Sequence, residues 1–331
     1  MTGGDHKTES VPERIVLLGP QRKSPTLLET ADSLGLGGGP FATITAGWEE
    51  RESIDRELLD HLGGHARNLG LFLRGQELFQ RDNELFVALQ RHHDRARAVR
   101  ELYSLRLQHA AGAAVELLER KPRAQDATAL PLEEADLDAE RREAIEDLRK
   151  LDADHLQRMR AIRDEFESEW NARERESVAQ HRDEIASLLD DVPCVCVAGG
   201  HVAVLLDRLR LFGIEELLGG RTVIAWSAGA MVLTPRIVLF HDHPPQGAGK
   251  AEAFDVGLNL AKDFVALPHA RKRLRLEDPV RVQLLARRFG PALCMILDQG
   301  DRADWDGAAW TVASGSRRLT EYGTLEEMIQ P

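Results

Sequence analysis

The sequence predicts an α/β protein: a three-layer, mostly parallel sheet into which one long antiparallel helical hairpin is inserted. Short apolar runs alternate with helical patterns from residue 14 to residue 74, and the same alternation resumes at residue 194. Alternation of this kind indicates βαβ units and a parallel sheet. Between the two stretches, residues 75–191 change in character and predict the hairpin.

The first stretch contains three runs that predict strands. They cover residues 15–18, 41–45 and 69–73, and each ends at a glycine or a short turn. Strand-like runs continue from residue 194 to about residue 298. Near the C-terminus, residues 305–314 are divided by Asp306-Gly307, which is typical of an antiparallel hairpin.

The intervening segment is rich in charge and poor in helix breakers. Residues 75–191 contain 19 Lys and Arg and 28 Asp and Glu, but only 2 of the 27 glycines and 2 of the 14 prolines. Both prolines, Pro122 and Pro131, bracket one break. The composition predicts two helices of roughly 45 and 55 residues joined near 122–131. Apolar residues at three-to-four spacing would form their shared face: Leu78, Leu85, Leu89, Leu102 and Leu105, then Ile145, Leu148, Met159, Ile162, Phe166 and Trp170.

These patterns divide the chain into three parts. Residues 1–13 are polar and predict a loose tail, residues 14–74 plus 192–331 form the α/β core, and residues 75–191 form the inserted hairpin. The hairpin could mediate a homodimer, bind a protein partner or form a lid over the site. Packing of one helix on the other already accounts for most of its apolar stripe.

The composition limits the classes of binding partner and the cellular compartment that we expect. The net charge of −12 argues against nucleic acid as the main partner. No apolar run reaches the ~20 residues that a membrane span needs, and no secretory signal precedes the core. Three cysteines in apolar runs, Cys194, Cys196 and Cys294, indicate reduced core thiols and a cytoplasmic protein. Neither Cys194-x-Cys196 nor His241-x-His243 has further ligands around it, so no metal or cofactor is expected.

The strongest functional signal is Ser227 in Trp226-Ser227-Ala228-Gly229-Ala230. It follows an apolar run, 222–225, and precedes a short helical stretch. A serine at a sharp strand-to-helix turn between small residues is how α/β hydrolytic enzymes present a nucleophile. The glycine that usually precedes such a turn is replaced here by Ala225.

Two further residues supply the groups that such a serine needs. Asp242 lies 15 residues after the serine and His269 lies 42 residues after it, each just beyond an apolar run. A serine hydroxyl needs a base to take its proton, and the base needs a third group to fix its tautomer. Loops at the carboxyl ends of parallel strands gather at one edge of a sheet. We therefore expect these three side chains to meet there.

The segment from the serine onward resembles the peptidase E family of serine peptidases, the family of aspartyl dipeptidases that also contains cyanophycinase. The resemblance covers residues 194–270, with a looser likeness on both flanks. It is carried by 225–230, 235–237, His241-Asp242, 254–255, 257–260 and Pro268-His269, and upstream by 198–201 with Leu205-Leu206. It implies a flavodoxin-like sheet of the class I glutamine amidotransferase type.

The resemblance also implies roles for these residues. Ser227 would be the nucleophile, His269 the general base and Asp242 the orienting acid. Cyanophycinase-like relatives take the acid from a later strand, which makes Asp298 the reserve candidate, and the sequence leaves both acids open. Ala228 with Gly199 or Gly200 would donate the oxyanion-hole N–H groups.

Substrate recognition is less defined by the sequence. Ala198 and His201 stand where the family usually has a glycine and an asparagine, so His201 is a candidate substrate contact. Arg271 and Arg273 follow the histidine and could hold a substrate carboxylate. Family substrates carry an N-terminal aspartate, which fits such a clamp.

The predicted function is a serine-type peptidase that cleaves short peptides or isopeptides through an acyl-enzyme. Glutamine amidotransfer is disfavoured because that chemistry places a cysteine at the turn. An ordinary α/β-hydrolase is disfavoured because its acid and base come from more widely separated loops. The alternative is a non-catalytic interaction protein that uses the helical arm, favoured by the changes at Ala198, His201 and Ala225.

Overall fold

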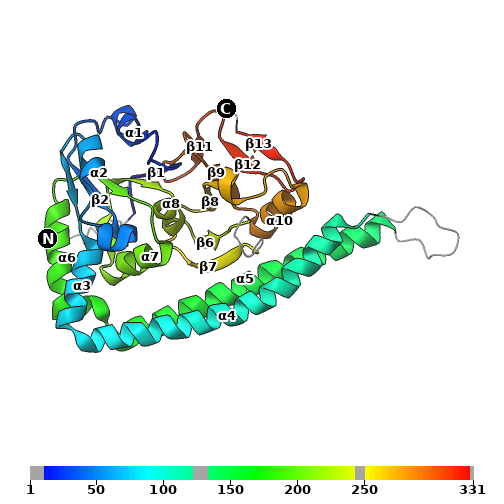
Figure 1. The fold of residues 1–331 in the computed structure, drawn as a ribbon, viewed down its shortest axis with the longest axis horizontal. Helices are drawn as coiled ribbons and strands as arrows, with labels where there is room; N and C mark the ends of the chain where they lie inside the picture. Colours follow the sequence, from blue (N-terminus) through cyan, green and yellow to red (C-terminus); the bar gives the residue numbers. More distant parts are fainter. Residues whose placement is uncertain (1–10, 122–132, 243–249, 329–331) are drawn as a thin grey trace, which may run out of the picture.

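The structure, a computed structural model, describes residues 11–121, 133–242 and 250–328. An α/β core carries a pair of long helices that runs along one side of it and extends beyond it (Figure 1). Most of the predicted tail, and the predicted joint at 122–131, lie outside the described residues.

A seven-stranded sheet forms the centre of the core, in the order β11-β10-β1-β5-β4-β2-β3. Five of its strands are parallel, and β10 and β11 join them as an antiparallel hairpin. The strands are β1 (Arg14–Leu18), β2 (Phe41–Ile44), β3 (Ala66–Asn68), β4 (Cys194–Val197), β5 (Thr222–Trp226), β10 (Arg302–Trp305) and β11 (Trp310–Val312). Every residue of β2, β4 and β5 is buried, as expected for strands covered on both faces. The mostly parallel α/β sheet and the C-terminal hairpin are confirmed.

The later strands form two smaller sheets. One has the order β13-β12-β9-β8, with β8 and β9 parallel, and the other pairs β6 with β7 in antiparallel fashion. Their bounds are β6 (Arg236–Leu239), β7 (Glu252–Val256), β8 (Phe264–Pro268), β9 (Leu293–Leu297), β12 (Arg317–Leu319) and β13 (Leu325–Glu327). The alternation predicted from residue 194 to about residue 298 is thus divided among three sheets. In consequence, the serine and the histidine end strands of different sheets.

The strand expected at 69–73 is wrong. The third strand is β3, which ends at Asn68, and Leu71–Arg81 forms helix α3. Gly70 adopts a positive φ of 63° at the start of this helix. The helix buries residues at 71, 72, 75 and 78, a spacing that fits one face of a helix and does not fit a strand.

Short helices connect the remaining strands of the core. They are α1 (Leu27–Ser33), the 3₁₀ turn η1 (Ala46–Arg51), α2 (Arg56–His61), α7 (Val202–Leu211), the 3₁₀ turn η3 (Ile214–Leu217), α8 (Ala228–Leu233), α9 (Ala270–Arg273) and α10 (Pro279–Phe289). The main apolar cluster joins strands of the central sheet to α3, α7 and α8.

The arm consists of α4 (Asn83–Glu119) and α5 (Glu134–Trp170), with 37 residues each. At 1.5 Å per residue each spans roughly 55 Å. They are shorter than predicted because α3 and α6 (Glu176–Leu189) are separate helices, with the turn η2 (Ala172–Glu174) before α6. The first predicted helix is interrupted at Asp82, which caps α4: its Oδ1 accepts from Leu85 N at 3.0 Å. The second predicted helix ends at Asn171, which has a φ of 41°. No helix in the described ranges is both long and apolar enough to cross a bilayer.

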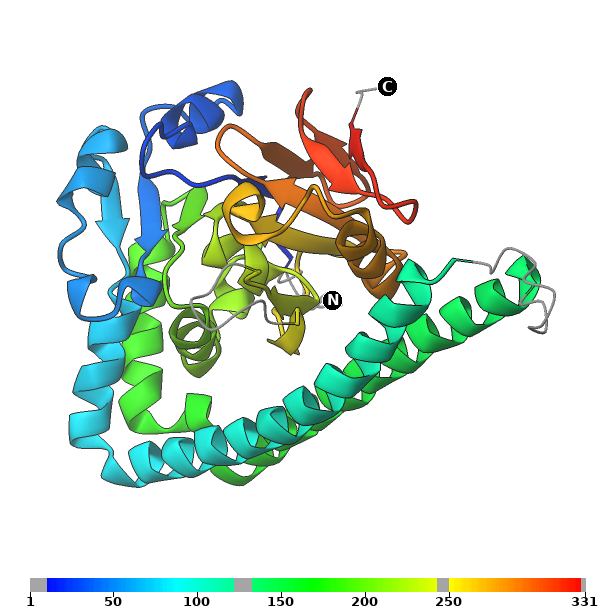
Figure 2. The ribbon, with the colours of Figure 1, turned by 45° about the vertical axis from the view of Figure 1, so that its right-hand side comes forward.

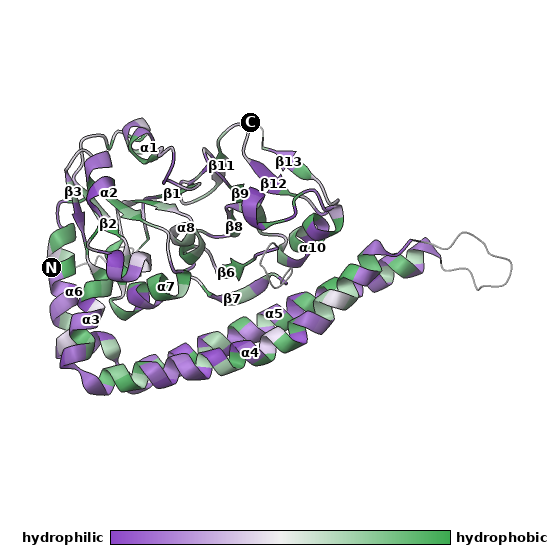
Figure 3. Cartoon of the chain, in the orientation of Figure 1, coloured by the Kyte–Doolittle hydropathy of each residue, from purple (hydrophilic) through white to green (hydrophobic). Residues whose placement is uncertain are grey.

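The two arm helices pack through a narrow apolar seam. Tyr103 and Leu107 of α4 and Leu148 and Leu151 of α5 are buried in one cluster. Leu102 and Leu105, which we expected in the seam, are 62% and 58% exposed. Hydrophilic residues cover much of the rest of the arm (Figure 3).

A buried polar network joins the arm to the core. Arg288 of α10 donates to both carboxylate oxygens of Asp152 in α5, at 2.7 and 2.6 Å. The hydroxyl of Tyr103 donates to Asp152 at 2.7 Å and accepts from Ala253 N of β7 at 3.1 Å. Leu284 of α10 adds apolar contact in the same place. The arm therefore lies along α10 and β7 (Figure 2).

Candidate active site

Ser227 occupies a strained turn between β5 and α8. Its backbone has φ 53° and ψ −121°, outside the regions that a serine ordinarily adopts. A Cβ added at Gly229 would lie 2.2 Å from the carbonyl oxygen of Val197, so only glycine allows the new helix to pass this close to β4. Strain held at such a turn is typical of a nucleophile presented above a sheet.

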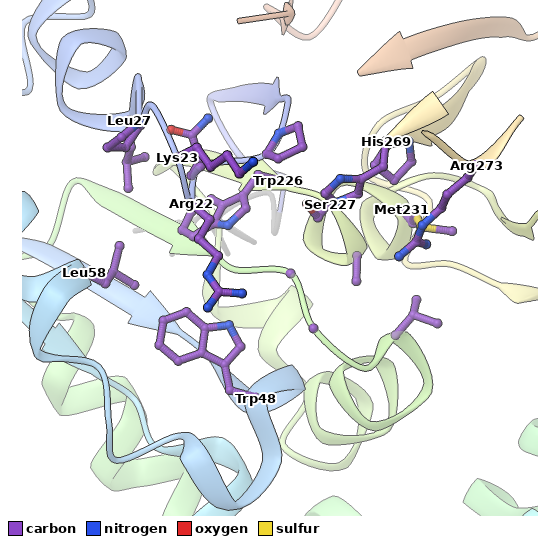
Figure 4. Close-up of a pocket in the computed structure, with 18 of the residues that line it drawn as sticks. Arg22, Lys23, Leu27, Trp48, Leu58, Trp226, Ser227, Met231, His269 and Arg273 are labelled. Atoms are coloured by element: carbon purple, nitrogen blue, oxygen red, sulfur yellow. Dashed lines mark hydrogen bonds between the residues drawn. The ribbon is translucent and has the colours of Figure 1, made fainter. Parts of the chain in front are cut away.

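His269 lies at the end of a strand that belongs to a different sheet from the strand that precedes Ser227. It follows β8, a strand of the second sheet, and also has a positive φ, 58°. Its Nε2 lies 3.1 Å from Ser227 Oγ, within hydrogen-bonding distance. Figure 4 shows the two side chains pointing toward each other. The structure thus brings together two residues that are 42 positions apart.

The surroundings of His269 favour its neutral form. Partial burial lowers the pKa of the imidazole below its usual value, and the positive charges of Arg273 and Lys272 lower it further. The negative charge of Asp298 opposes this shift. A neutral imidazole can accept a proton, which is what a general base requires.

Asp242 is occupied by other partners. Its Oδ1 accepts from Nη2 of Arg281 at 2.6 Å, and its Oδ2 accepts from Nε of the same arginine at 3.1 Å. Oδ2 also accepts from Arg275 N at 3.0 Å. The strand before it, β6, pairs with β7, whereas the strand before the histidine, β8, pairs with β9.

The pairing of β8 with β9 places Asp298 and His269 at the ends of neighbouring strands. β8 and β9 are parallel, with Pro268 opposite Leu297, so the next residues, His269 and Asp298, leave the two strands at the same level. Asp298 Oδ2 accepts from Arg271 N at 3.1 Å. Among the described residues, no hydrogen bond joins the imidazole to either carboxylate.

The predicted oxyanion loop lies directly against the serine. A Cβ added at Gly199 would be 2.6 Å from Ser227 Cβ and 3.3 Å from Ala228 N, so a side chain there would collide with the nucleophile. Gly200, at φ 127°, packs on the backbone of Gly47. Gly199, Gly200 and Ala228 all line the cavity in front of Ser227.

That cavity has a volume of about 980 Å³, and Ser227 and His269 lie in its wall. Of the three predicted substrate contacts, only Arg273 lines it. His201 instead caps α7, its Nδ1 accepting from Val204 N at 3.3 Å. Arg271 is 67% exposed and pairs with Asp298 at 3.6 Å. Within the described part of the chain, no group of His, Cys, Asp and Glu is arranged to hold a metal ion.

Sequence reasoning missed the N-terminal wall of the cavity. Arg22 and Lys23 follow β1, and Trp48 follows β2. The signal was available, because the carboxyl ends of β1, β2 and β5 lie at the same edge of the parallel sheet.

A family model matches the part of the chain that carries these residues. The model of Peptidase family S51 matches residues 152–299, which contain the serine, the histidine, both acids and the glycine-rich loop. A search of curated proteins finds no match.

Two solved structures are similar in part. A peptidase from an acI-B1 Actinobacterium is 15% identical, with 97% of this chain and 96% of that chain covered and a TM-score of 0.47. A protein of Listeria monocytogenes EGD-e described as peptidase E is 22% identical, with 40% of this chain and 64% of that chain covered and a TM-score of 0.29. The part of the chain that carries the site is similar to peptidase family S51, the peptidase E family, and the protein is a serine-type peptidase.

Proposed function

We propose that this peptidase cleaves short peptides or isopeptides through an acyl-enzyme formed on Ser227. The observation that carries the proposal is the 3.1 Å separation between Ser227 Oγ and His269 Nε2. A serine hydroxyl within hydrogen-bonding distance of a neutral imidazole is the arrangement that activates it as a nucleophile.

The reaction runs in two halves. Ser227 Oγ attacks the substrate carbonyl carbon while its proton passes to His269 Nε2. The N–H of Ala228, with that of Gly199 or Gly200, stabilises the oxyanion. The C–N bond then breaks, and the imidazolium gives its proton to the leaving amine. Water attacks the ester, His269 takes its proton and returns it to Ser227 Oγ, and the product acid leaves.

We assign the orienting acid to Asp298. Its charge acts on the imidazole, and the pairing of β8 with β9 sets the two residues side by side. Asp242 has its carboxylate engaged by Arg281, which supports a structural role for it. We expect the hydrogen bond between Asp298 and the imidazole to form on substrate binding, because catalytic hydrogen bonds often tighten only in the complex.

A fluorophosphonate probe tests the proposed chemistry. The wild-type protein should be labelled on Ser227 and should release products from a dipeptide and isopeptide library. Both activities should vanish in Ser227→Ala and persist in Ser24→Ala, a change at an exposed serine outside the cavity wall. Absence of both labelling and turnover in folded wild-type protein would reject the proposal.

A further inference from the structure

One wall of the active-site cavity is apolar and continuous with the nucleophile turn. Trp226, the residue before Ser227, belongs to a buried cluster with Leu27. Leu58 of α2 and Trp48 of η1 pack against that cluster and are themselves only partly buried. All four residues line the cavity, but Leu27 is fully buried, so the apolar surface open to a ligand comes mainly from Trp48 and Leu58.

Trp48 is held at a fixed place relative to the oxyanion loop. The carbonyl of Gly47 accepts from His201 N at 2.7 Å, and Trp48 N donates to Thr45 O at 2.8 Å. A Cβ added at Gly200 would lie 2.2 Å from the Gly47 oxygen, so the two turns touch backbone to backbone. The loop that would bind the oxyanion therefore also positions the indole.

The indole of Trp48 has an unused donor. Within the described part of the chain, its N–H has no hydrogen-bond partner, whereas the indole of Trp310 donates to Lys262 O at 2.8 Å. Ile54 also lines the cavity and is 71% exposed. An apolar surface with one free donor is typical of a site that binds an organic group with a polar end.

The wall lies on one side of the reacting atoms. Figure 4 shows Ser227 and His269 between Trp48 and Leu58 on one side and Arg273 on the other. A peptide held by its carbonyl at Ser227 would direct one flanking residue toward the indole.

We infer that Trp48 and Leu58 form a subsite for a bulky apolar side chain of the peptide, beside the scissile bond. The inference rests on the proposed peptidase reaction and adds a substrate class to it. The competing occupant is an acidic side chain, because the cations Arg22 and Lys23 line the same cavity, and Arg22 lies beside the indole of Trp48 (Figure 4). Both are exposed, so water screens them, whereas the apolar surface gains by being covered.

Binding to the Ser227→Ala protein tests the subsite without requiring hydrolysis. Tetraglycine is compared by calorimetric titration with peptides that carry Phe, or Asp, at each of the four positions in turn. The best Phe peptide should bind about tenfold more tightly than tetraglycine, and the best Asp peptide more weakly than the best Phe peptide.

Variants of Trp48 and Leu58 test whether these residues cause the tighter binding of Phe peptides. Trp48→Ala and Leu58→Ala, each added to Ser227→Ala, should reduce the Phe advantage to about threefold or less, and Trp48→Phe should retain it. Tyr322→Ala, at a 77% exposed aromatic residue outside the cavity wall, should not alter it. If Trp48→Ala does not fold, Leu58→Ala carries the test. Equal binding of Phe and glycine peptides, preference for Asp, or an advantage that survives both wall variants would overturn the inference.

The two proposals fail differently. If Phe peptides bind selectively but Ser227 is neither labelled nor able to turn peptides over, the peptidase reaction is wrong and the subsite stands. If peptides are cleaved without apolar preference, the reaction stands and the subsite is wrong.

Discussion

Arg281 and Asp242 form a buried two-bond ion pair at the end of helix α9. The side chains are 7% and 1% exposed, and the bonds measure 2.6 and 3.1 Å. Removing one member of such a pair leaves the other charge buried without compensation. The pair therefore accounts for the burial of this carboxylate, which makes no hydrogen bond to His269 among the described residues.

The two acids should respond differently to substitution. Asp298→Asn should lower kcat by roughly 10²–10⁴-fold with little loss of stability, because it removes the carboxylate that we propose orients the imidazole. Asp242→Asn should lower the free energy of unfolding by about 3–5 kcal/mol and leave kcat of the folded fraction within about tenfold. Steady-state kinetics and urea unfolding on both variants provide the measurement, and the reverse pattern would identify Asp242 as the catalytic acid.

Gly199 should not tolerate a methyl group. In Gly199→Ala the new Cβ would meet Ser227 Cβ at 2.6 Å, so either the nucleophile or the oxyanion loop must move. We expect kcat to fall by about 10²–10³-fold, the range for loss of one oxyanion donor. Gly112→Ala is the matched control, because a Cβ there meets no atom within 4 Å. Comparable activity of the two variants would argue against an oxyanion role for this loop.

The pH dependence of kcat/KM should follow the titration of His269. Because the pKa of His269 lies below its usual value, kcat/KM should be constant around neutral pH and fall as the pH drops through that lowered pKa. Arg273→Gln removes a positive charge that disfavours the imidazolium, so the pKa should rise and the acidic limb should move to higher pH. Asp298→Asn should move it to lower pH. A limb that stays in place in both variants would mean that another group titrates.

The arm should depend on Arg288 for its attachment. Arg288→Ala leaves Asp152 buried without its partner and should lower the free energy of unfolding by about 3–5 kcal/mol. Arg95→Ala breaks an ion pair with Glu165 in which both side chains are more than half exposed, and it should cost about 0–1 kcal/mol. Chemical denaturation compares them. Equal effects would show that the buried network does not hold the arm.

Local pattern was enough to predict most elements of the core. The parallel strands, the terminal hairpin and the turn at Ser227 follow from short apolar runs that end at small residues, and the structure confirms them. Residues 69–73 misled because their four apolar side chains fit a strand as well as the first turn of a helix. Leu102 and Leu105 were predicted in the seam because they fit the helical spacing of apolar residues. That spacing identifies the apolar stripe of a helix, but it does not show which edge of the stripe the partner helix covers.

By itself, the sequence determined which chemical groups this protein has: a serine at a strand-to-helix turn, a histidine and two aspartates after strands, and a charged helical arm. Only the tertiary structure decided which groups meet. Pairing of β8 with β9 sets His269 beside Asp298, and Arg281, 39 residues after Asp242, takes up that carboxylate. The physical reason is that strand pairing and buried charge compensation join residues distant along the chain, and a single sequence does not record either.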